Sequence, residues 1–196
     1  MKHCSAENIL LPLQKLQQAH DELAHRDILS FDLYKRLKHM VLHFYKYAGR
    51  IETSRDIGDT PQLRRTLIDT FIICMASANA MNLSLGESIT DVAEANDLDS
   101  LAHELGKKIL STDLSVEAVR ALVVLGGQMA KAIESADHME RGDPRATMEG
   151  LLPQLTAVVL GILGHLNGKL DSDVRARLSG VELKSIFLRP LPTLER

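Results

Sequence analysis

Residues 60–82 decide the fold, and they read TPQLRRTLIDTFIICMASANAMN. Thr60 precedes a proline, which places an N-cap side chain just before the first helical position, where the missing N–H of proline costs no hydrogen bond. From Phe71 to Ala78 the segment is apolar around nearly its whole circumference, as is typical of a helix buried on all sides. We therefore expect a helix over residues 61–82, with Phe71–Ala78 among the most buried segments.

A second segment repeats this design further along the chain. Asp143 precedes Pro144, the most apolar run spans Leu155–Leu163, and Asn167 ends the segment as Asn82 ends the first. Each segment is followed by a short turn and another helical stretch. The shared order predicts a duplicated unit of about four helices, and chance similarity of two helical halves is the alternative.

Helical periodicity extends over most of the sequence. Apolar residues step by four and three positions from Leu33 to Ile51, which draws one stripe along a helix. A proline inside a helix removes one hydrogen bond, so Pro153 predicts a kink or a break near Gly150. Caps and periodicity together predict eight helices and no convincing strand, over residues 12–26, 31–56, 61–82, 85–95, 99–110, 116–141, 144–167 and 172–186.

These helices predict an all-α bundle made of two similar four-helix halves. We expect an N-terminal helix within residues 1–30. A first helical module then spans residues 31–112, and a second, more degenerate module spans 113–196 and closes with an extended tail around Pro190. The interruption of the helical period by cap-forming residues at 111–113 marks the junction between the modules.

Composition excludes several classes of function. The 196 residues are 45% hydrophobic and 25% charged, which is typical of a globular chain and not of a disordered one. With 23 Lys and Arg against 26 Asp and Glu there is no basic excess to attract nucleic acid. The apolar patch Ile9–Leu13 is interrupted by Pro12 and followed by charge, so we expect neither a membrane span nor a signal peptide, no membrane partner and a cytoplasmic protein. Cys4 and Cys74 are expected to be free thiols, Cys74 as a core residue.

Two stretches of the first half resemble a known family. A helix ending in KYAGRI (residues 46–51) is followed by a polar loop and by LRRTLID (63–69), which leads into an apolar run. This order resembles the MazG-type all-α nucleoside triphosphate pyrophosphohydrolases, in which two helices carry a Glu-Glu-x-Gly-Glu-Leu segment and a Glu-x-x-Asp segment. The second half is similar through GQMAKAI (127–133) and EGLL (149–152), so the chain resembles the fused, two-module members.

The resemblance implies a nucleotide as partner and Mg²⁺ as cofactor, with four carboxylates converging on the ion. Aligned on Gly49, however, the paired glutamates are replaced by Lys46 and Tyr47, and the glutamate after the glycine is replaced by Arg50. A chain that resembles this family is also compatible with a homodimer.

The second motif retains one acid in each half. Asp69 stands at the family's aspartate while its partner position is Thr66, and the other half keeps Glu149. The resemblance therefore implies Asp69 and Glu149 as the metal ligands, and a hard dication held by one carboxylate from each half would be weakly bound.

Lys46, Arg50 and Asp69 are the candidate ligand-binding residues. The two cations, placed where acids are expected, are suited to neutralise phosphate directly, and the alternative is that they are solvated residues beside a core stripe. Asp69 precedes an apolar run, so it needs a partner. That partner is either a ligand or metal, or an ion pair with Arg65 or with a basic residue of the preceding helix.

Histidine pairs offer a weaker metal hypothesis. His39 and His43 lie four residues apart on one helical face, and Glu22 with His25 forms a single Glu-x-x-His, but neither pattern supplies a third ligand by spacing alone.

Two functions are therefore consistent with the sequence, and no catalytic residue can be assigned from it. The first is a MazG-like nucleotide-handling protein with a degenerate pyrophosphohydrolase site and weak or no hydrolysis. The second is a non-catalytic helical interaction or scaffolding protein.

Overall fold

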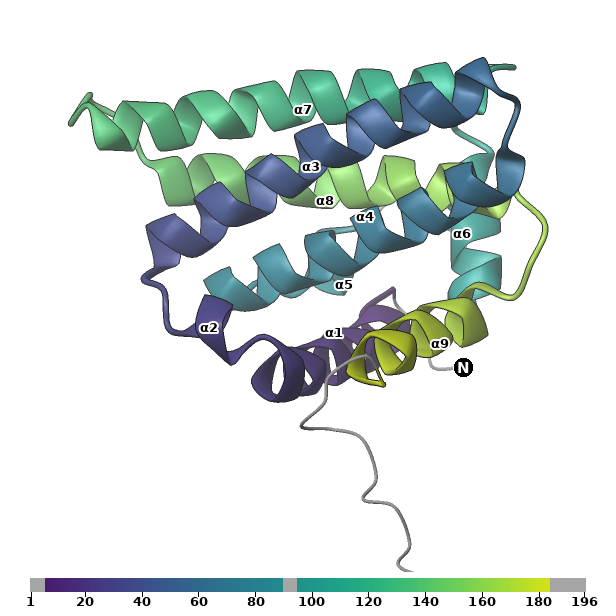
Figure 1. The fold of residues 1–196 in the computed structure, drawn as a ribbon, viewed down its shortest axis with the longest axis horizontal. Helices are drawn as coiled ribbons and strands as arrows, with labels where there is room; N and C mark the ends of the chain where they lie inside the picture. Colours follow the sequence, from purple (N-terminus) through teal and green to yellow (C-terminus); the bar gives the residue numbers. More distant parts are fainter. Residues whose placement is uncertain (1–5, 90–94, 184–196) are drawn as a thin grey trace, which may run out of the picture.

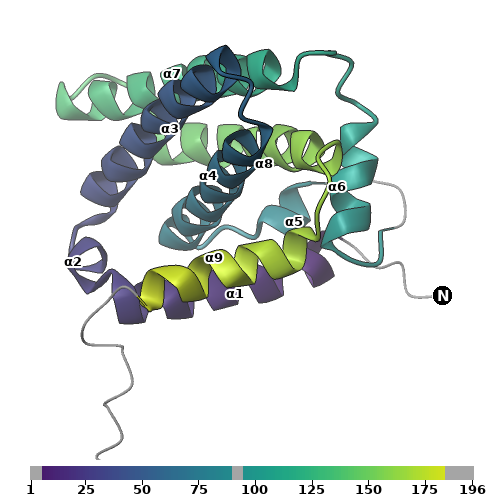
Figure 2. The same ribbon diagram turned by 45° about the vertical axis from the view of Figure 1, so that its right-hand side comes forward.

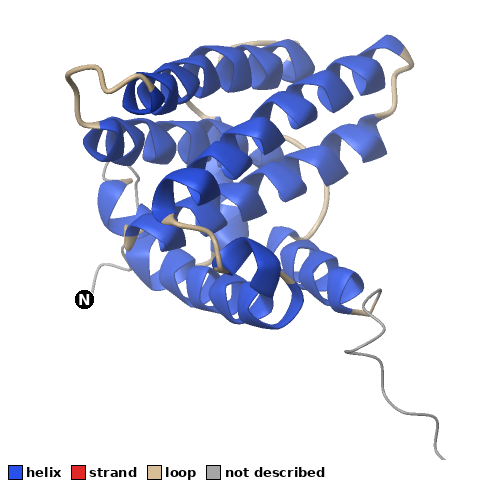
Figure 3. Cartoon of the chain, turned by 60° about the vertical axis from the view of Figure 1, so that its left-hand side comes forward, coloured by secondary structure: helices blue, strands red, loops and turns tan. Residues whose placement is uncertain are grey.

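The chain folds into helices alone over the residues that the structure, a computed structural model, describes, which are 6–89 and 95–183. Figures 1 and 3 show the same arrangement from two sides. The prediction of an all-α bundle is confirmed. The helices are α1 (Ala6–Ala24), α2 (Arg26–Leu29), α3 (Leu33–Asp56), α4 (Thr60–Met81), α5 (Leu85–Ser88), α6 (Leu98–Gly106), α7 (Leu114–Asp137), α8 (Pro144–Gly164) and α9 (Leu170–Glu182).

Side-chain caps fix where most helices begin. The carboxylate of Asp59 accepts from the N–H of Gln62 at the start of α4, and that of Asp143 accepts from the N–H of Ala146 at the start of α8. Each of these two helices has a proline in its first turn. The predicted cap of α4 was one residue late, because Asp59 and not Thr60 is the cap.

The core lies where two helical hairpins meet. The hairpin of α3 and α4 packs on the hairpin of α7 and α8, with α3 against α7 and α4 against α8, and α6 crosses α8 (Figure 1). Phe71, Cys74 and Met75 of α4 are fully buried, as are Leu155 and Leu160 of α8. Both segments predicted as the most buried therefore lie at the centre of the core.

The paired hairpins agree in part with two similar halves. Equivalent helices of the predicted modules face each other. The likeness ends there, because α5 has 4 residues and α9 has 13, and α6 has no counterpart among the described residues of the second half. A duplication therefore stays a prediction, as do the module boundaries.

The nine helices of the described residues differ in number and bounds from the eight predicted, and three of the differences involve a proline or a shortened helix. α1 begins at Ala6 and includes Pro12. Because proline has no N–H, the carbonyl of Asn8, four residues earlier, has no partner within the helix, but Asn8 is exposed and water can bond it. α8 runs through Pro153 without a break. The helix predicted over 85–95 ends at Ser88, and residues 90–94 and the predicted C-terminal tail lie outside the described residues.

α8 is long and apolar enough to cross a membrane when judged by length and composition alone. In the structure it is a core helix, with 56% of its most apolar window buried inside the bundle.

α1 and α9 lie side by side (Figure 2), with α9 against the first half of α4 and α1 against its C-terminal half. Buried amides fix α1 in this position: Gln14 donates from Nε2 to Asn79 Oδ1 at 3.0 Å and accepts at Oε1 from the N–H of Leu85, while Asn79 donates to Gln17 Oε1 at 2.8 Å. Since a buried amide that loses its partner pays the full cost of desolvation, these bonds set the register of α1 on α4. α1, α3, α4 and α9 thereby surround one hollow.

The crossing of α6 over α8 predicts a sharp difference between two glycines of α8. A Cβ at Gly164 would lie 2.3 Å from the carbonyl oxygen of Ala102, whereas a Cβ at Gly150 would meet nothing within 4 Å. Gly164→Ala should lower the free energy of unfolding by about 1 to 3 kcal/mol through overpacking. Gly150→Ala, the matched control, should raise it by up to about 1 kcal/mol through helix propensity. Urea unfolding measures both, and equal effects would contradict the close crossing.

Candidate functional site

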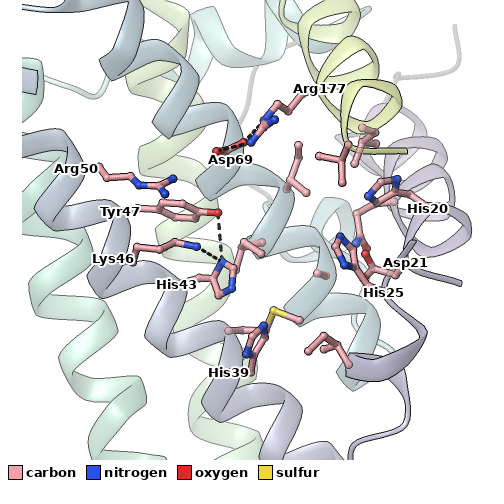
Figure 4. A pocket seen from close by; sticks show the side chains of 18 residues that line it. His20, Asp21, His25, His39, His43, Lys46, Tyr47, Arg50, Asp69 and Arg177 are labelled. Atoms are coloured by element: carbon pink, nitrogen blue, oxygen red, sulfur yellow. Dashed lines mark hydrogen bonds and ion pairs between the residues drawn. The ribbon is translucent and has the colours of Figure 1, made fainter. Parts of the chain in front are cut away.

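A pocket of about 310 Å³ opens between α1, α3, α4 and α9. Ten of its 18 lining residues have titratable side chains. Figure 4 shows the α3 side chains along one wall and the α1 side chains opposite, with Asp69 and Arg177 closing one end. The titratable lining residues are His20, Asp21, His25, His39, His43, Lys46, Tyr47, Arg50, Asp69 and Arg177.

The wall formed by α3 follows from helical spacing. His39, His43 and Tyr47 follow one another at steps of four residues. Lys46 and Arg50 are also four residues apart, at positions i−1 and i+3 relative to Tyr47. Residues at i and i+4 lie on the same helical face, so all five side chains project toward one side. The structure therefore brings the predicted Lys46 and Arg50 into the same pocket.

Both cations lie against the ring of Tyr47. The Lys46 Nζ is 4.6 Å from the ring centroid and the Arg50 guanidinium carbon is 5.8 Å from it, both within reach of a cation–π attraction. Burial, followed by the nearby negative charge of Asp69, raises the pKa of the Tyr47 phenol. Tyr47 therefore stays a neutral hydroxyl and holds the two cations over its ring.

His43 has a defined tautomer. Its Nδ1 lies 2.9 Å from Lys46 Nζ and 3.3 Å from the Tyr47 hydroxyl. An ammonium group can only donate, so Nδ1 is the acceptor and the proton of the neutral ring is on Nε2. Burial, then the charges of Lys46 and His39, lower the pKa of His43 to about 4. Neutral His43 thus offers one N–H donor at physiological pH.

Asp69 is paired with Arg177 of α9. The guanidinium donates from Nε to Oδ1 at 2.5 Å and from Nη2 to Oδ2 at 3.1 Å, which is the two-pronged geometry of strong arginine–carboxylate pairs. The Asp69 side chain is only 12% exposed. Neither predicted ion pair forms, since Arg65 donates to Gln62 instead. α9 supplies the partner because it packs against α4 on the side that Asp69 faces.

The structure does not bring the two predicted metal ligands together. Glu149 lies on α8, accepts from Arg145 Nε at 2.7 Å, and lines a different hollow beside α6. Asp69 and Glu149 are each engaged by an arginine, in separate pockets. The prediction of one shared Mg²⁺ site at these two residues is not supported by this geometry.

A second polar cluster lies across the pocket from α3. His20, Asp21 and His25 come from the end of α1 and the turn after it, and each offers one ligand atom within 4.8 Å of the others. This cluster was not predicted from the sequence: Asp21 and His25 are four residues apart, but His20 is five residues from His25, a spacing that does not place two side chains on one helical face. The signal available was the crowding of His20, Asp21 and His25 within six residues, where a helix end lets the chain turn back.

Cys74 takes no part in the pocket. It is fully buried in α4, and burial raises the pKa of its thiol to about 12, against a smaller opposing effect of a hydrogen bond with Thr156. Its prediction as a core residue is confirmed, and a thiol that stays protonated is a poor nucleophile. Cys4 lies outside the described residues.

No protein-family model, curated protein or solved structure matches this chain. Function must therefore be inferred from the side chains themselves. At its α3 and α9 end the pocket presents Lys46, Arg50 and Arg177 against the carboxylate of Asp69, with the N–H of His43 beside them. This end is suited to bind an anion.

The lowered pKa of His43 predicts how stability depends on pH. In the unfolded chain His43 has the ordinary histidine pKa of 6.5, whereas in the folded chain its pKa is about 4. The unfolded chain therefore binds a proton at His43 more tightly than the folded chain does. The stabilising contribution is complete above pH 6.5 and is lost as the pH falls from 6.5 to 4. Because the ring is only half buried, we expect a loss of about 1 kcal/mol and not the full linkage value.

The comparison is between wild type and His43→Gln in urea at pH 7 and at pH 4.5. The wild-type free energy of unfolding should fall by about 1 kcal/mol more than that of the variant over this interval. Parallel losses in the two proteins would contradict the assignment.

Proposed function

We propose that the pocket binds the phosphate groups of a nucleotide without a metal ion, and that hydrolysis is weak or absent. The observation that supports this most is the convergence of Lys46, Arg50 and Arg177 on one pocket of a chain whose net charge is −3. Guanidinium and ammonium groups bind phosphate oxygens by charge-assisted hydrogen bonds. The Nε2–H of His43 is a neutral donor on the same pocket lining.

The resemblance to MazG-type proteins supports a nucleotide over other anions. The positions aligned with that family's two acidic segments, Lys46 to Arg50 on α3 and Asp69 on α4, line one pocket between packed helices. The chain is then a MazG-like protein in which cations replace the acids that would hold Mg²⁺.

Electrostatics favours phosphate over Mg²⁺ at these side chains. A divalent ion ~6 Å from one fixed positive charge is repelled by roughly 1 kcal/mol in a water-like dielectric and about 5 kcal/mol at an effective dielectric of 20. Lys46 and Arg50 both oppose such an ion, and Asp69 is already neutralised by Arg177. The same charges attract a polyphosphate.

Size and lining set what else is bound. A volume of about 310 Å³ is at the small end for ligand pockets, so it holds the phosphates and part of the remaining molecule. Ile72, Ile73 and Ala76 of α4 give the middle of the pocket an apolar wall. This wall suits the sugar or base edge of a nucleotide better than free inorganic phosphate.

An interaction protein is the second candidate, and one surface supports it. Leu42 and Tyr45 of α3 and Val123 and Val124 of α7 are 63%, 39%, 48% and 49% exposed. The Tyr45 hydroxyl lies beside Gly127 of α7, so the two helices share this outer face. A homodimer through this face is compatible with nucleotide binding, and a cytoplasmic location remains an expectation.

The proposal is tested by calorimetric titration with a panel of nucleoside triphosphates in EDTA. Wild type should bind at least one of them without metal. Lys46→Ala and Arg50→Ala should each weaken binding about tenfold or more, because each removes a charge-assisted hydrogen bond worth about 1.5 to 3 kcal/mol. Lys38→Ala is the matched control, since Lys38 is on α3 but pairs with Asp137 on α7, outside the pocket.

A parallel assay follows pyrophosphate release with Mg²⁺ or Mn²⁺. Robust turnover that is abolished by chelator and by Asp69→Ala would contradict the proposal. Absence of any nucleotide binding would favour the interaction protein.

A further inference from the structure

The cluster of His20, Asp21 and His25 has the composition of a metal site. Two imidazoles and one carboxylate form a donor set that first-row divalent ions accept with open coordination positions. The ligand atoms of the three residues all lie within 4.8 Å of one another. None of these residues belongs to the segments that resemble MazG-type proteins, and the cluster lies opposite the α3 cations (Figure 4).

The chain turn after α1 builds this cluster. His20 and Asp21 lie in the last turns of α1, which ends at Ala24. His25 leaves the helical conformation with φ −132° and ψ 41°, and its N–H still bonds the Asp21 carbonyl at 2.9 Å. This bend keeps His25 beside the helix it has just left, and its ring meets that of His20 edge-on at 5.4 Å between centroids.

Glu182 of α9 orients His20. The Nδ1 of His20 lies 2.8 Å from Glu182 Oε1, and the His20 side chain is 4% exposed. When Nδ1–H donates to this carboxylate, the lone pair is on Nε2 and is available to a metal. A carboxylate that fixes the tautomer of a ligating histidine is the usual outer partner in zinc sites.

Asp21 is held in the same interior. It is 8% exposed, and the Gln17 side chain that bonds it is fixed by Asn79 of α4. A buried carboxylate needs a positive partner, and the basic side chains that act electrostatically on Asp21 belong to His25, His20 and Arg36. None of these forms an ion pair with Asp21 among the described residues. The carboxylate thus has acceptor capacity left for a cation.

We propose that His20, Asp21 and His25 bind one divalent transition-metal ion, with Zn²⁺ as the best match and an open position facing the pocket. Two nitrogen donors favour Zn²⁺ over Mg²⁺, which prefers an all-oxygen shell. Tetrahedral ligands ~2.1 Å from an ion are ~3.4 Å apart, so the cluster closes on it by a shift of about 1 to 2 Å. His25 supplies this shift, because it is only partly buried and makes no capping bond.

The metal site is independent of the proposed phosphate site in its residues. A bound ion would place a further positive charge in the pocket, on the wall opposite Lys46 and Arg50. A ligand spanning the pocket would then meet cations from both sides.

The test is a calorimetric titration of the untagged, full-length chain with Zn²⁺ alone, after EDTA treatment and dialysis. Wild type should bind one equivalent with a Kd of about 1 μM or tighter. His25→Gln should weaken binding at least 100-fold because it removes a ligand. Glu182→Gln should weaken it about 10- to 100-fold because it removes the carboxylate that orients His20. His138→Gln is the matched control, because His138 is an exposed histidine next to Glu134 at the end of α7.

Circular dichroism and urea unfolding establish that each variant is folded. His25→Gln replaces a side chain at the surface end of the pocket, so the bundle should be unchanged. The proposal is overturned if wild type binds no stoichiometric Zn²⁺, if His25→Gln binds as tightly as wild type, or if His138→Gln loses as much affinity. Because the titration contains no nucleotide, its failure leaves nucleotide binding in EDTA unaffected, and failure of nucleotide binding leaves the zinc result standing.

Discussion

The bidentate pair between Asp69 and Arg177 is the interaction on which the pocket depends. It joins α4 to α9 across 108 residues of sequence, at distances of 2.5 and 3.1 Å. α9 in turn packs against α1, whose His20 bonds Glu182 of α9. A second ion pair, between Arg64 of α4 and Asp173 of α9, also joins the two helices. Of these two pairs, only the one between Asp69 and Arg177 lines the pocket, so without it this end of the hollow would lose its closure.

The same pair decides which chemistry the pocket favours. A carboxylate that already accepts two charge-assisted hydrogen bonds has little left to offer a metal ion. With Asp69 so engaged, Lys46 and Arg50 set the charge of this end of the pocket, and Tyr47 holds both in place. Charge therefore favours recognition of phosphate over metal-assisted hydrolysis. Asp69, which the resemblance implies as a metal ligand, is paired instead with Arg177 and positions its guanidinium.

The features that the sequence predicted correctly are those set by residues close together in the chain, namely the long helices. The 3.6-residue period and the cap-and-proline starts predicted the long helices, and the resemblance aligned on Gly49 selected Lys46 and Arg50, which share a pocket because they are four residues apart on α3. Arg177 could not be found as the partner of Asp69, because no local pattern links residues on α4 and α9. The cluster of His20, Asp21 and His25 was not predicted for a related reason. α1 ends at Ala24, between His20 and His25, so helical periodicity no longer tells which side chains share a face.

The most direct test of the metal-free phosphate site is a crystal structure of the complex with a non-hydrolysable nucleoside triphosphate analogue, grown in EDTA. The account predicts phosphate oxygens within hydrogen-bond distance of the Lys46 and Arg50 side chains, with Asp69 still bound to Arg177. A metal ion on Asp69 with Arg177 displaced, or a nucleotide bound away from this pocket, would contradict it.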